Sequence, residues 1–444
     1  MSIHLPVSTR VPVDFGNPSI LRDEALCIKC GACRRICHDE IGVGEFYNLA
    51  SCGDKPICVH CGQCTNVCPV DSLTERPEWG AVQSAIRNPD KIVIVSTSPS
   101  VRVALGEEFG LAPGTLVEDK MVAALRALGV DYVLDTTFAA DLTIMEEASE
   151  LVERITKKNR PLPQFTSCCP AWVKFVETFY PERLPNLSTV KSPIGMQGPT
   201  IKTYFAKLHG LNPENIVHVA LTPCTAKKFE IRRAELCAAA RHDQREDVPD
   251  TDHVITTREL AAWLRAFDVS FDALKGSSYD PLLGRGSGAG VIFGNTGGVM
   301  EAAVRTAYHF VTGEIPPANL LALSPVRGME GVKSATLRLG DVDMRVAIIH
   351  GLSNAKAVLE QMKTGDAPYD FVEVMTCRGG CIGGGGQPKH EGGLTDEIRS
   401  ARIAGLYSED EGLTVRSSHE NAEIVAVYRD FFGSPLSELA EKLL

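Results

Sequence analysis

The sequence predicts a long α/β region of helix-covered sheets, preceded by a small α+β domain. Two patterns lead to this division. Cysteines crowd one short N-terminal segment in a duplicated spacing, and from about residue 90 short apolar runs alternate with amphipathic helical patterns. Alternation of strands and helices favours sheets covered by helices. We expect residues 1–19 to be an N-terminal extension, residues 20–77 the small domain, and residues 90–444 one larger domain.

Six apolar runs predict strands in the larger region; they are 91–99, 132–137, 216–221, 291–293, 346–350 and 371–375. Apolar residues at helical spacing predict helices between them; these are Val117–Leu128, Asp141–Thr156, Arg258–Phe267 and Asn354–Lys363. The polar stretch Ala238–Asp252 is expected to be a surface loop or a frayed helix.

The composition excludes several classes of protein. Hydrophobic residues make up 44% of the chain and charged residues 23%, which excludes wholesale disorder and fibrous repeats. A net charge of −11 makes the chain a poor partner for nucleic acid or an anionic membrane surface. No apolar run is long enough to span a membrane, and the first residues lack the apolar segment of a secretory signal. We therefore expect a cytoplasmic protein without a disulfide framework.

Cysteine is the informative excess, with 15 in the chain. Without export, metal binding or catalysis explains them better than disulfides. Two runs, Cys27–Cys37 and Cys58–Cys68, each follow the spacing C-x₂-C-x₂-C-x₃-C. In such runs three cysteines bind one 4Fe–4S cluster and the fourth binds the other cluster. The sequence therefore predicts two ligand sets: Cys27, Cys30, Cys33 and Cys68, and Cys58, Cys61, Cys64 and Cys37.

The alternative for these runs is a pair of zinc knuckles, but zinc sites usually show two widely separated C-x₂-C pairs. Over about residues 20–77 the segment resembles bacterial two-cluster ferredoxins, although His38 stands where that family usually has proline. Cys52 lies outside both runs, and we expect it to be a small buried apolar residue.

Three further cysteine segments lie at the ends of predicted elements: TSCCPAW at 166–172, TPCTAKKFE at 222–230 and MTCRGGCIGGGGQP at 375–388. Four consecutive glycines indicate backbone that passes close to a bulky group. A phosphate-binding loop is the alternative, but the pattern G-x-x-x-x-G-K-[ST] is missing. A metal cluster fits a cysteine-flanked glycine loop better.

These segments resemble the three signature motifs of iron-iron (FeFe) hydrogenases. The resemblance continues through SVRVALGEEFG at 100–110, FGNTGGVMEAAVR at 293–305 and SHENAEIVAVYRDFFG at 418–433. It implies that residues 90–444 are the catalytic domain of the short, single-chain form with two accessory clusters. The implied activity is reversible oxidation of H₂ and reduction of protons. Implied partners are ferredoxin or a similar electron carrier and dedicated maturation factors.

The resemblance also implies an H-cluster, which is a 4Fe–4S cubane linked to a two-iron subsite with CO, cyanide and azadithiolate. The cysteines that match the cubane ligands are Cys169, Cys224, Cys377 and Cys381. Cys168 matches the thiol that exchanges a proton with the azadithiolate amine. The residues that match an outward proton path are Glu147, Ser192, Glu150 and, at its surface end, Arg154.

Other residues match positions beside the cofactor. Lys227 matches the residue that hydrogen-bonds a cyanide, and Glu230 is its neighbour in the same motif. The remaining cofactor-binding positions are Ser98, Pro99, Thr222, Ala226 and Met375. Without the resemblance, Glu147 and Glu150 would be better explained as a solvated acidic stripe on one helix face, with an i,i+4 salt bridge from Glu150 to Arg154.

Four residues depart from the family pattern. Thr222 stands where methionine is common and Ala226 where serine is common. Arg378 replaces histidine or proline, and Ser98 replaces alanine. Such changes tune a metal site more often than they abolish it, and they suggest a less-studied branch of the family.

Two alternative functions remain open from the sequence. A hydrogen-sensing regulatory member would turn over slowly, but such members tend to lose the relay cysteine, which is present here as Cys168. An iron–sulfur assembly relative would have no two-iron subsite, but such relatives usually lack an intact TSCCP segment.

Overall fold

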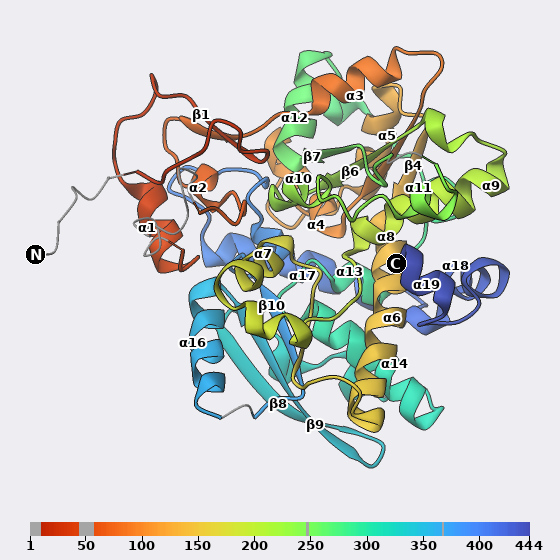
Figure 1. The fold of residues 1–444 in the computed structure, drawn as a ribbon. Helices are drawn as coiled ribbons and strands as arrows, with labels where there is room; N and C mark the ends of the chain where they lie inside the picture. Colours follow the sequence, from red (N-terminus) through yellow and green to blue (C-terminus); the bar gives the residue numbers. More distant parts are fainter. Residues whose placement is uncertain (1–9, 44–56, 246–247, 366–367) are drawn as a thin grey trace, which may run out of the picture.

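The computed structural model describes residues 10–43, 57–245, 248–365 and 368–444, so the expectation for Cys52 lies outside the described residues. The described part contains a two-stranded sheet and two four-stranded sheets with helices packed around them (Figure 1). Among these residues no helix is long and apolar enough to span a membrane.

The N-terminal segment folds as two similar halves. In each half a glycine with positive φ, Gly31 at 79° or Gly62 at 71°, precedes a short helix that carries the third cysteine of its run. These helices are α1 (Ala32–Asp39) and α2 (Gln63–Asn66). Strands β1 (Ile20–Arg22) and β2 (Leu73–Glu75) pair antiparallel. The duplicated spacing is therefore a duplicated backbone conformation.

The first large sheet is entirely parallel, in the order β4-β3-β6-β7. Its strands are β3 (Ile92–Thr97), β4 (Tyr132–Asp135), β6 (Ile216–Thr222) and β7 (His253–Thr256). One face packs against α3 (Trp79–Ile86), α5 (Glu118–Ala127) and α12 (Thr257–Ala266). The other face packs against α6 (Thr136–Lys157) and α8 (Pro193–Thr200). Burial on both faces explains why β3 and β6 are continuous apolar runs.

The second large sheet is mixed, in the order β5-β10-β9-β8. Its strands are β5 (Gln164–Phe165), β8 (Val332–Leu339), β9 (Val342–His350) and β10 (Phe371–Met375), and only β8 is antiparallel to its neighbour. One face packs on α6 and α14 (Gly298–Thr312). The other packs on α7 (Pro170–Phe179) and α16 (Leu352–Lys363). The long helix α6 thus touches both sheets (Figure 1).

Five of the six expected strands are confirmed with small shifts at their ends, and one is wrong. Residues 291–293 end a helix, α13 (Gly288–Ile292). A Cβ atom at Gly290 would lie 2.5 Å from the Thr137 carbonyl oxygen, so the glycines let α13 pack directly on α6. Because α13 is buried on all sides, it has no polar face to distinguish it from a buried strand.

The C-terminal segment is helical and is fastened to the rest by buried charges. It contains α17 (Asp396–Gly412), α18 (Ala422–Val427) and α19 (Glu438–Leu443). Asp410 on α17 receives two hydrogen bonds of 2.9 Å from Arg305 on α14. The Asp141 carboxylate on α6 accepts hydrogen bonds from Ser287, Ser418 and Asn421. The remaining short helices are α4 (Pro99–Arg102), α9 (Ala206–His209), α10 (Ala226–Glu230), α11 (Ala238–His242) and α15 (Ala318–Leu321).

We expect Asp410→Ala to destabilise the protein strongly, because it removes one of the two carboxylates that pair with the fully buried guanidinium of Arg305, leaving only Glu301, and it also removes the carboxylate that pairs with Arg416. Breaking such a buried pair costs about 3–5 kcal/mol. The control is Asp343→Ala, which breaks an exposed pair with Arg338 that contributes at most about 1 kcal/mol. Thermal unfolding of both variants checks this, and equal melting temperatures would contradict the anchoring role.

Candidate active site

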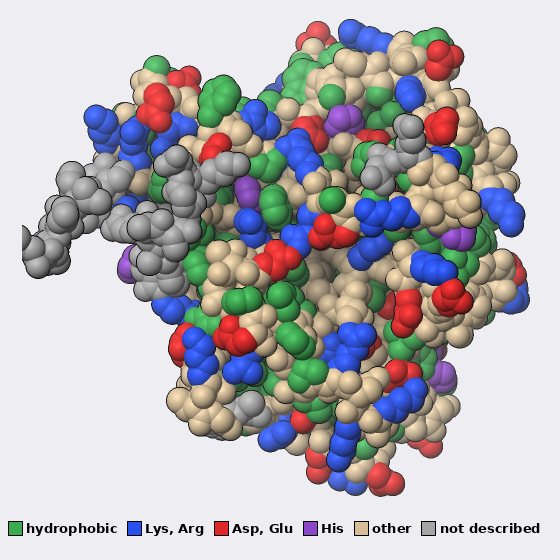
Figure 2. Space-filling view, in the orientation of Figure 1, with side chains coloured by type: hydrophobic (Ala, Val, Ile, Leu, Met, Phe, Trp, Pro, Cys, Tyr) green, Lys and Arg blue, Asp and Glu red, His purple; other side chains and the backbone are tan. Residues whose placement is uncertain are grey.

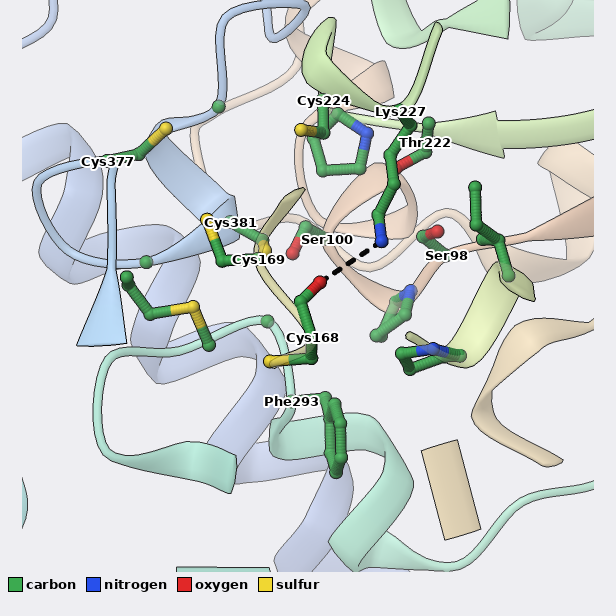
Figure 3. Close-up of a pocket in the computed structure, with 18 of the residues that line it drawn as sticks. Ser98, Ser100, Cys168, Cys169, Thr222, Cys224, Lys227, Phe293, Cys377 and Cys381 are labelled. Carbon is green, nitrogen blue, oxygen red and sulfur yellow. Dashed lines mark hydrogen bonds between the residues drawn. The ribbon is translucent and has the colours of Figure 1, made fainter. Parts of the chain in front are cut away.

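The cysteine segments of the larger region converge where two sheets meet. Cys169 follows β5, Cys377 follows β10, and Cys224 follows β6 of the other sheet. Side chains at the carboxyl ends of parallel strands gather at one edge, where α/β proteins place their sites. The five cysteines line one pocket: Cys168, Cys169, Cys224, Cys377 and Cys381 (Figure 3).

The glycine run passes between two other backbones. A Cβ atom at Gly384 would lie 2.4 Å from the Pro223 carbonyl oxygen, and one at Gly385 would lie 2.3 Å from the Cys61 carbonyl oxygen. Real Cβ atoms do not approach so closely, so only glycine fits both positions. The bulky group that the glycine run was expected to approach is therefore backbone. On one side it is the segment 222–224, and on the other it is the N-terminal segment at Cys61.

The N-terminal segment also touches a sulfur of the pocket. The Gln63 side-chain amide donates hydrogen bonds to the Cys377 Sγ atom at 3.1 Å and to the Gly383 carbonyl at 2.8 Å. Arg258 reinforces this contact, since it donates to the Gly385 carbonyl and pairs with Glu75. One side chain therefore connects the second cysteine run with the pocket.

The two predicted ligand sets of the N-terminal segment line two separate cavities. One is lined by Cys27, Cys30, Cys33 and Cys68. The other is lined by Cys37, Cys58, Cys61 and Cys64. Each cavity thus takes three cysteines from one run and one from the other. Cys237, which stands outside all these sets, is buried and donates to the Ala234 carbonyl.

Burial and mutual proximity disfavour thiolates in the pocket. Burial, followed by the neighbouring Cys169, raises the pKa of Cys224 to about 11. Burial, then Cys224 and Cys169, raises the pKa of Cys377 well above its ordinary value. Clustered thiolates need positive charge to be stable in such surroundings. Iron supplies that charge, so this donor set fits an iron–sulfur group.

Lys227 places an ammonium group at the wall of the pocket. Its Nζ atom lies 3.1 Å from the Cys168 carbonyl oxygen and 2.9 Å from Glu230 Oε2 (Figure 3). Glu230 and Cys224 hold the pKa of Lys227 above its ordinary value although burial alone lowers it. A buried, charged donor of this kind suits an anionic ligand.

Of the other positions expected beside the cofactor, some line the pocket and some do not. Ser98, Pro99, Thr222 and Met375 line the pocket. Ala226 is fully buried and is not among the lining residues, and Glu230 lines a different cavity. Phe293 and Ile194, which were not expected, contribute apolar wall. Both lie far from the cysteine motifs in sequence. Phe293 opens the segment 293–305 that resembles the hydrogenases, so the sequence carries a signal for it, whereas Ile194 lies outside every such segment.

Helix α6 carries the two glutamates expected to form a proton path. Glu147 is buried, and burial together with the charge of Glu150 raises its pKa to about 8. Glu150 is also buried and accepts a hydrogen bond of 2.8 Å from Ser188. Both glutamates therefore face the interior, which excludes a solvated acidic stripe.

Two expectations for this path do not match the structure. Ser192 caps α8, where its hydroxyl accepts from the Gly195 N–H, and Ser188 occupies the place beside the glutamates. Both serines precede the same helix, so the sequence offered no signal to choose between them. Arg154 is fully buried rather than at the surface, and it binds Glu150 at 2.7 Å and the Leu187 carbonyl at 2.7 Å.

Comparison with known families agrees with this geometry. A family model described as the C-terminal domain of the iron-only hydrogenase large subunit matches residues 91–385. The chain belongs to the FeFe hydrogenase family. A second model, the iron hydrogenase small subunit, matches residues 396–444, so this FeFe hydrogenase carries both regions in one chain.

Relatives of this hydrogenase span nearly its whole length. It is 45% identical to the NADP-reducing hydrogenase subunit HndD of Solidesulfovibrio fructosivorans, over 96% of this chain and 74% of that protein. It is 42% identical to iron hydrogenase 1 of Clostridium pasteurianum, over 99% of this chain and 77% of that protein. The structure of an apo FeFe hydrogenase from Chlamydomonas reinhardtii superposes with a TM-score of 0.71 at 41% identity, over 82% of this chain and 97% of that one.

Membership makes the chain an oxidoreductase that acts on H₂ and protons, with an H-cluster and iron–sulfur clusters as its cofactors. The cysteine-lined pocket fits this group, because its buried thiols need cationic charge and its Lys227 ammonium faces the same space. An electron carrier is the remaining implied partner.

We expect Gln63→Leu to lower the reduction potential of the cubane in the cysteine pocket, because it removes the N–H donor to Cys377 Sγ. A hydrogen bond to a charged group contributes about 1.5–3 kcal/mol, and about 1.4 kcal/mol corresponds to roughly 59 mV for one electron. The control is Asn66→Leu, which removes a donor to the Gly384 carbonyl and touches no sulfur. Redox titration followed by EPR measures both, and identical potentials in the two variants would contradict the inference.

Proposed function

We propose that this chain catalyses the reversible oxidation of H₂ and reduction of protons, with electrons passing through two 4Fe–4S clusters to or from a ferredoxin or similar carrier. The proposal assigns the clusters to the two cavities of the N-terminal segment, which has the cysteine spacing of a two-cluster ferredoxin. The observation that carries it is the pocket where five buried or half-buried cysteines and Lys227 converge beside that segment.

When bound, the H-cluster supplies the redox chemistry of hydrogen. The proposed cubane ligands are Cys169, Cys224, Cys377 and Cys381. Lys227 would hold an anionic ligand of the group through its ammonium. Cys168, which points into the pocket beside Phe293, would hold and pass protons (Figure 3). From there protons would move to Glu147 and on to the hydrogen-bonded pair of Glu150 and Ser188, while the permanently charged Arg154 fixes Glu150 in place.

The alternative is a hydrogen-sensing member with slow turnover. Cys168 favours the enzyme, because a thiol in this place is retained where protons must be passed. We also propose that the chain belongs to a less-studied branch of the family. Four residues that depart from the common pattern support this: Thr222, Ala226, Arg378 and Ser98. A cytoplasmic location and dependence on maturation factors are proposed with it.

Protein produced without maturation factors should hold three cubanes, with about twelve iron atoms, and no hydrogenase activity. After the two-iron subsite is supplied, infrared spectra should show CO and cyanide bands and the protein should evolve H₂. Iron analysis, infrared spectroscopy and gas chromatography check this. Activity in a preparation that contains only cubanes would refute the assignment, and bands without appreciable turnover would favour the sensor.

Replacing adjacent cysteines should separate the relay from the ligand. We expect Cys168→Ser to keep the infrared bands and to lose turnover by about a hundredfold or more, because a hydroxyl is a far weaker acid than a thiol. Cys169→Ser should instead lose iron. Turnover of Cys168→Ser at the wild-type rate would mean that protons take another route.

The double variant Thr222→Met with Ala226→Ser should restore the common family residues and shift the potential of the catalytic site by tens of millivolts. The Thr222 side chain lines the pocket, so the change alters packing and hydrogen bonding without altering a ligand. Protein-film voltammetry should show a changed bias between H₂ production and uptake. Unchanged bias and unchanged infrared bands would make these departures incidental.

A further inference from the structure

A second cavity, of about 220 Å³, lies beside the buried glutamates of α6. Its wall comes from α7, from the segment that leads into α8, and from the residues that follow α10. It shares only Pro170 with the cysteine pocket. The lining includes hydroxyl, carboxylate and guanidinium groups, and a polar space of this size holds several water molecules.

The inner end of this cavity reaches Glu150 through one hydroxyl group. Ser188 lines the cavity and donates a hydrogen bond of 2.8 Å to Glu150 Oε2. The backbone N–H of Thr189, which also lines the cavity, donates to the same oxygen at 3.0 Å. The Glu150 carboxylate is therefore one hydrogen bond away from water in the cavity.

The arginine at the other side of Glu150 cannot serve as an exit. Arg154 is fully buried, and its guanidinium donates to Glu150 and to the carbonyls of Pro161 and Leu187. A guanidinium stays protonated in proteins, so it cannot accept and release the protons in transit. Arg154 orients the carboxylate. Arg160, whose half-exposed guanidinium lies 3.7 Å from Glu150 Oε1, also stays protonated, so a group other than these arginines must pass protons between Glu150 and solvent.

The outer end of the cavity has an exposed carboxylate. Glu235 lines the cavity, and 60% of its side chain is exposed. Its carboxylate accepts a hydrogen bond of 2.8 Å from Arg233. Figure 2 shows a hollow near the middle of one face of the molecule, with acidic and basic side chains around it. An exposed carboxylate exchanges protons freely with bulk water, so Glu235 can collect and release them at this rim.

We propose that this cavity is the outer section of the proton route, in which Ser188 and cavity water connect Glu150 with Glu235 and bulk solvent. The inference rests on the proposed function. At each transfer one O–H bond breaks as the next forms: Ser188 gives its proton to Glu150 while it takes one from water. No electron moves in these steps, and the net result is one proton carried inward or outward.

The test uses the complete enzyme with three substitutions. Val173→Phe fills the cavity from α7 without changing a polar group, since Val173 is a half-buried lining residue. Glu235→Gln removes the carboxylate at the rim. The matched control is Glu153→Gln, which removes a partly exposed carboxylate on α6 that pairs with Lys157 and does not line the cavity.

For H₂ evolution driven by reduced methyl viologen, Val173→Phe and Glu235→Gln should lower kcat by about tenfold, less than the direct relay because water can partly bypass the rim. Both should raise the solvent deuterium isotope effect, while Glu153→Gln should match the wild type. Infrared bands verify an intact site in each variant. Wild-type kcat and isotope effect in both cavity variants would overturn the proposal, as would an equal loss in Glu153→Gln.

A second readout needs no turnover. Glu147, whose pKa is about 8, is protonated at neutral pH, and its carboxyl stretch shifts when deuterium replaces the proton. After transfer to D₂O, Val173→Phe should slow this shift severalfold, with the band identified by its loss in Glu147→Gln. An unchanged exchange rate would overturn the cavity route even if the wild type proved inactive, and inactivity alone would refute only the proposed function.

Discussion

The contact of the glycine run with two other backbones is the constraint on which the site depends. Gly384 lies against the Pro223 carbonyl and Gly385 against the Cys61 carbonyl, at distances that exclude any side chain. These contacts fix Cys377 and Cys381 relative to Cys224, which comes from the other sheet. They also press the N-terminal segment against the pocket, so Gln63 can reach the Cys377 sulfur. One loop thus sets both the shape of the pocket and its connection to the proposed electron route.

Charge imposes the second constraint. Five cysteines line the pocket. Among the described residues that line it, only Lys227 has a cationic side chain. Burial and the neighbouring thiols raise the pKa of Cys377 and Cys224, so these thiols resist ionisation unless positive charge lies beside them. An iron–sulfur group would neutralise this set, which joins metal binding to the stability of the site. The same effect of burial acts on the glutamates of α6 outside the pocket, because burial raises the pKa of Glu147 and keeps it protonated at neutral pH.

Much of this arrangement could be predicted from the sequence. The cysteine spacing predicts which four cysteines line each N-terminal cavity, and strands such as β6 and β10 are predictable because buried parallel strands are continuous apolar runs. Helix α13 was mistaken for a strand, since a helix buried on all sides has the same apolar pattern. The resemblance points to Ser192 and the structure places Ser188 beside Glu150, because a motif match supplies order along the chain and not distance in space. Arg154 is buried because its guanidinium donates hydrogen bonds to the backbone carbonyls of Pro161 and Leu187. These carbonyls lie outside α6, so the spacing of residues along that helix does not predict the contact.

The central claim is that the N-terminal segment and the cysteine pocket form one unit through the glycine run. Gly385→Ala tests it most directly, with Gly412→Ala as control because a Cβ atom there would meet nothing within 4 Å. The measurement is EPR of the reduced cubane-loaded protein, in which magnetic coupling reports the proximity of the pocket cubane to the cluster proposed at Cys61. We expect coupling in the wild type and in Gly412→Ala, and its loss in Gly385→Ala with iron content unchanged. Full coupling in Gly385→Ala would contradict the account.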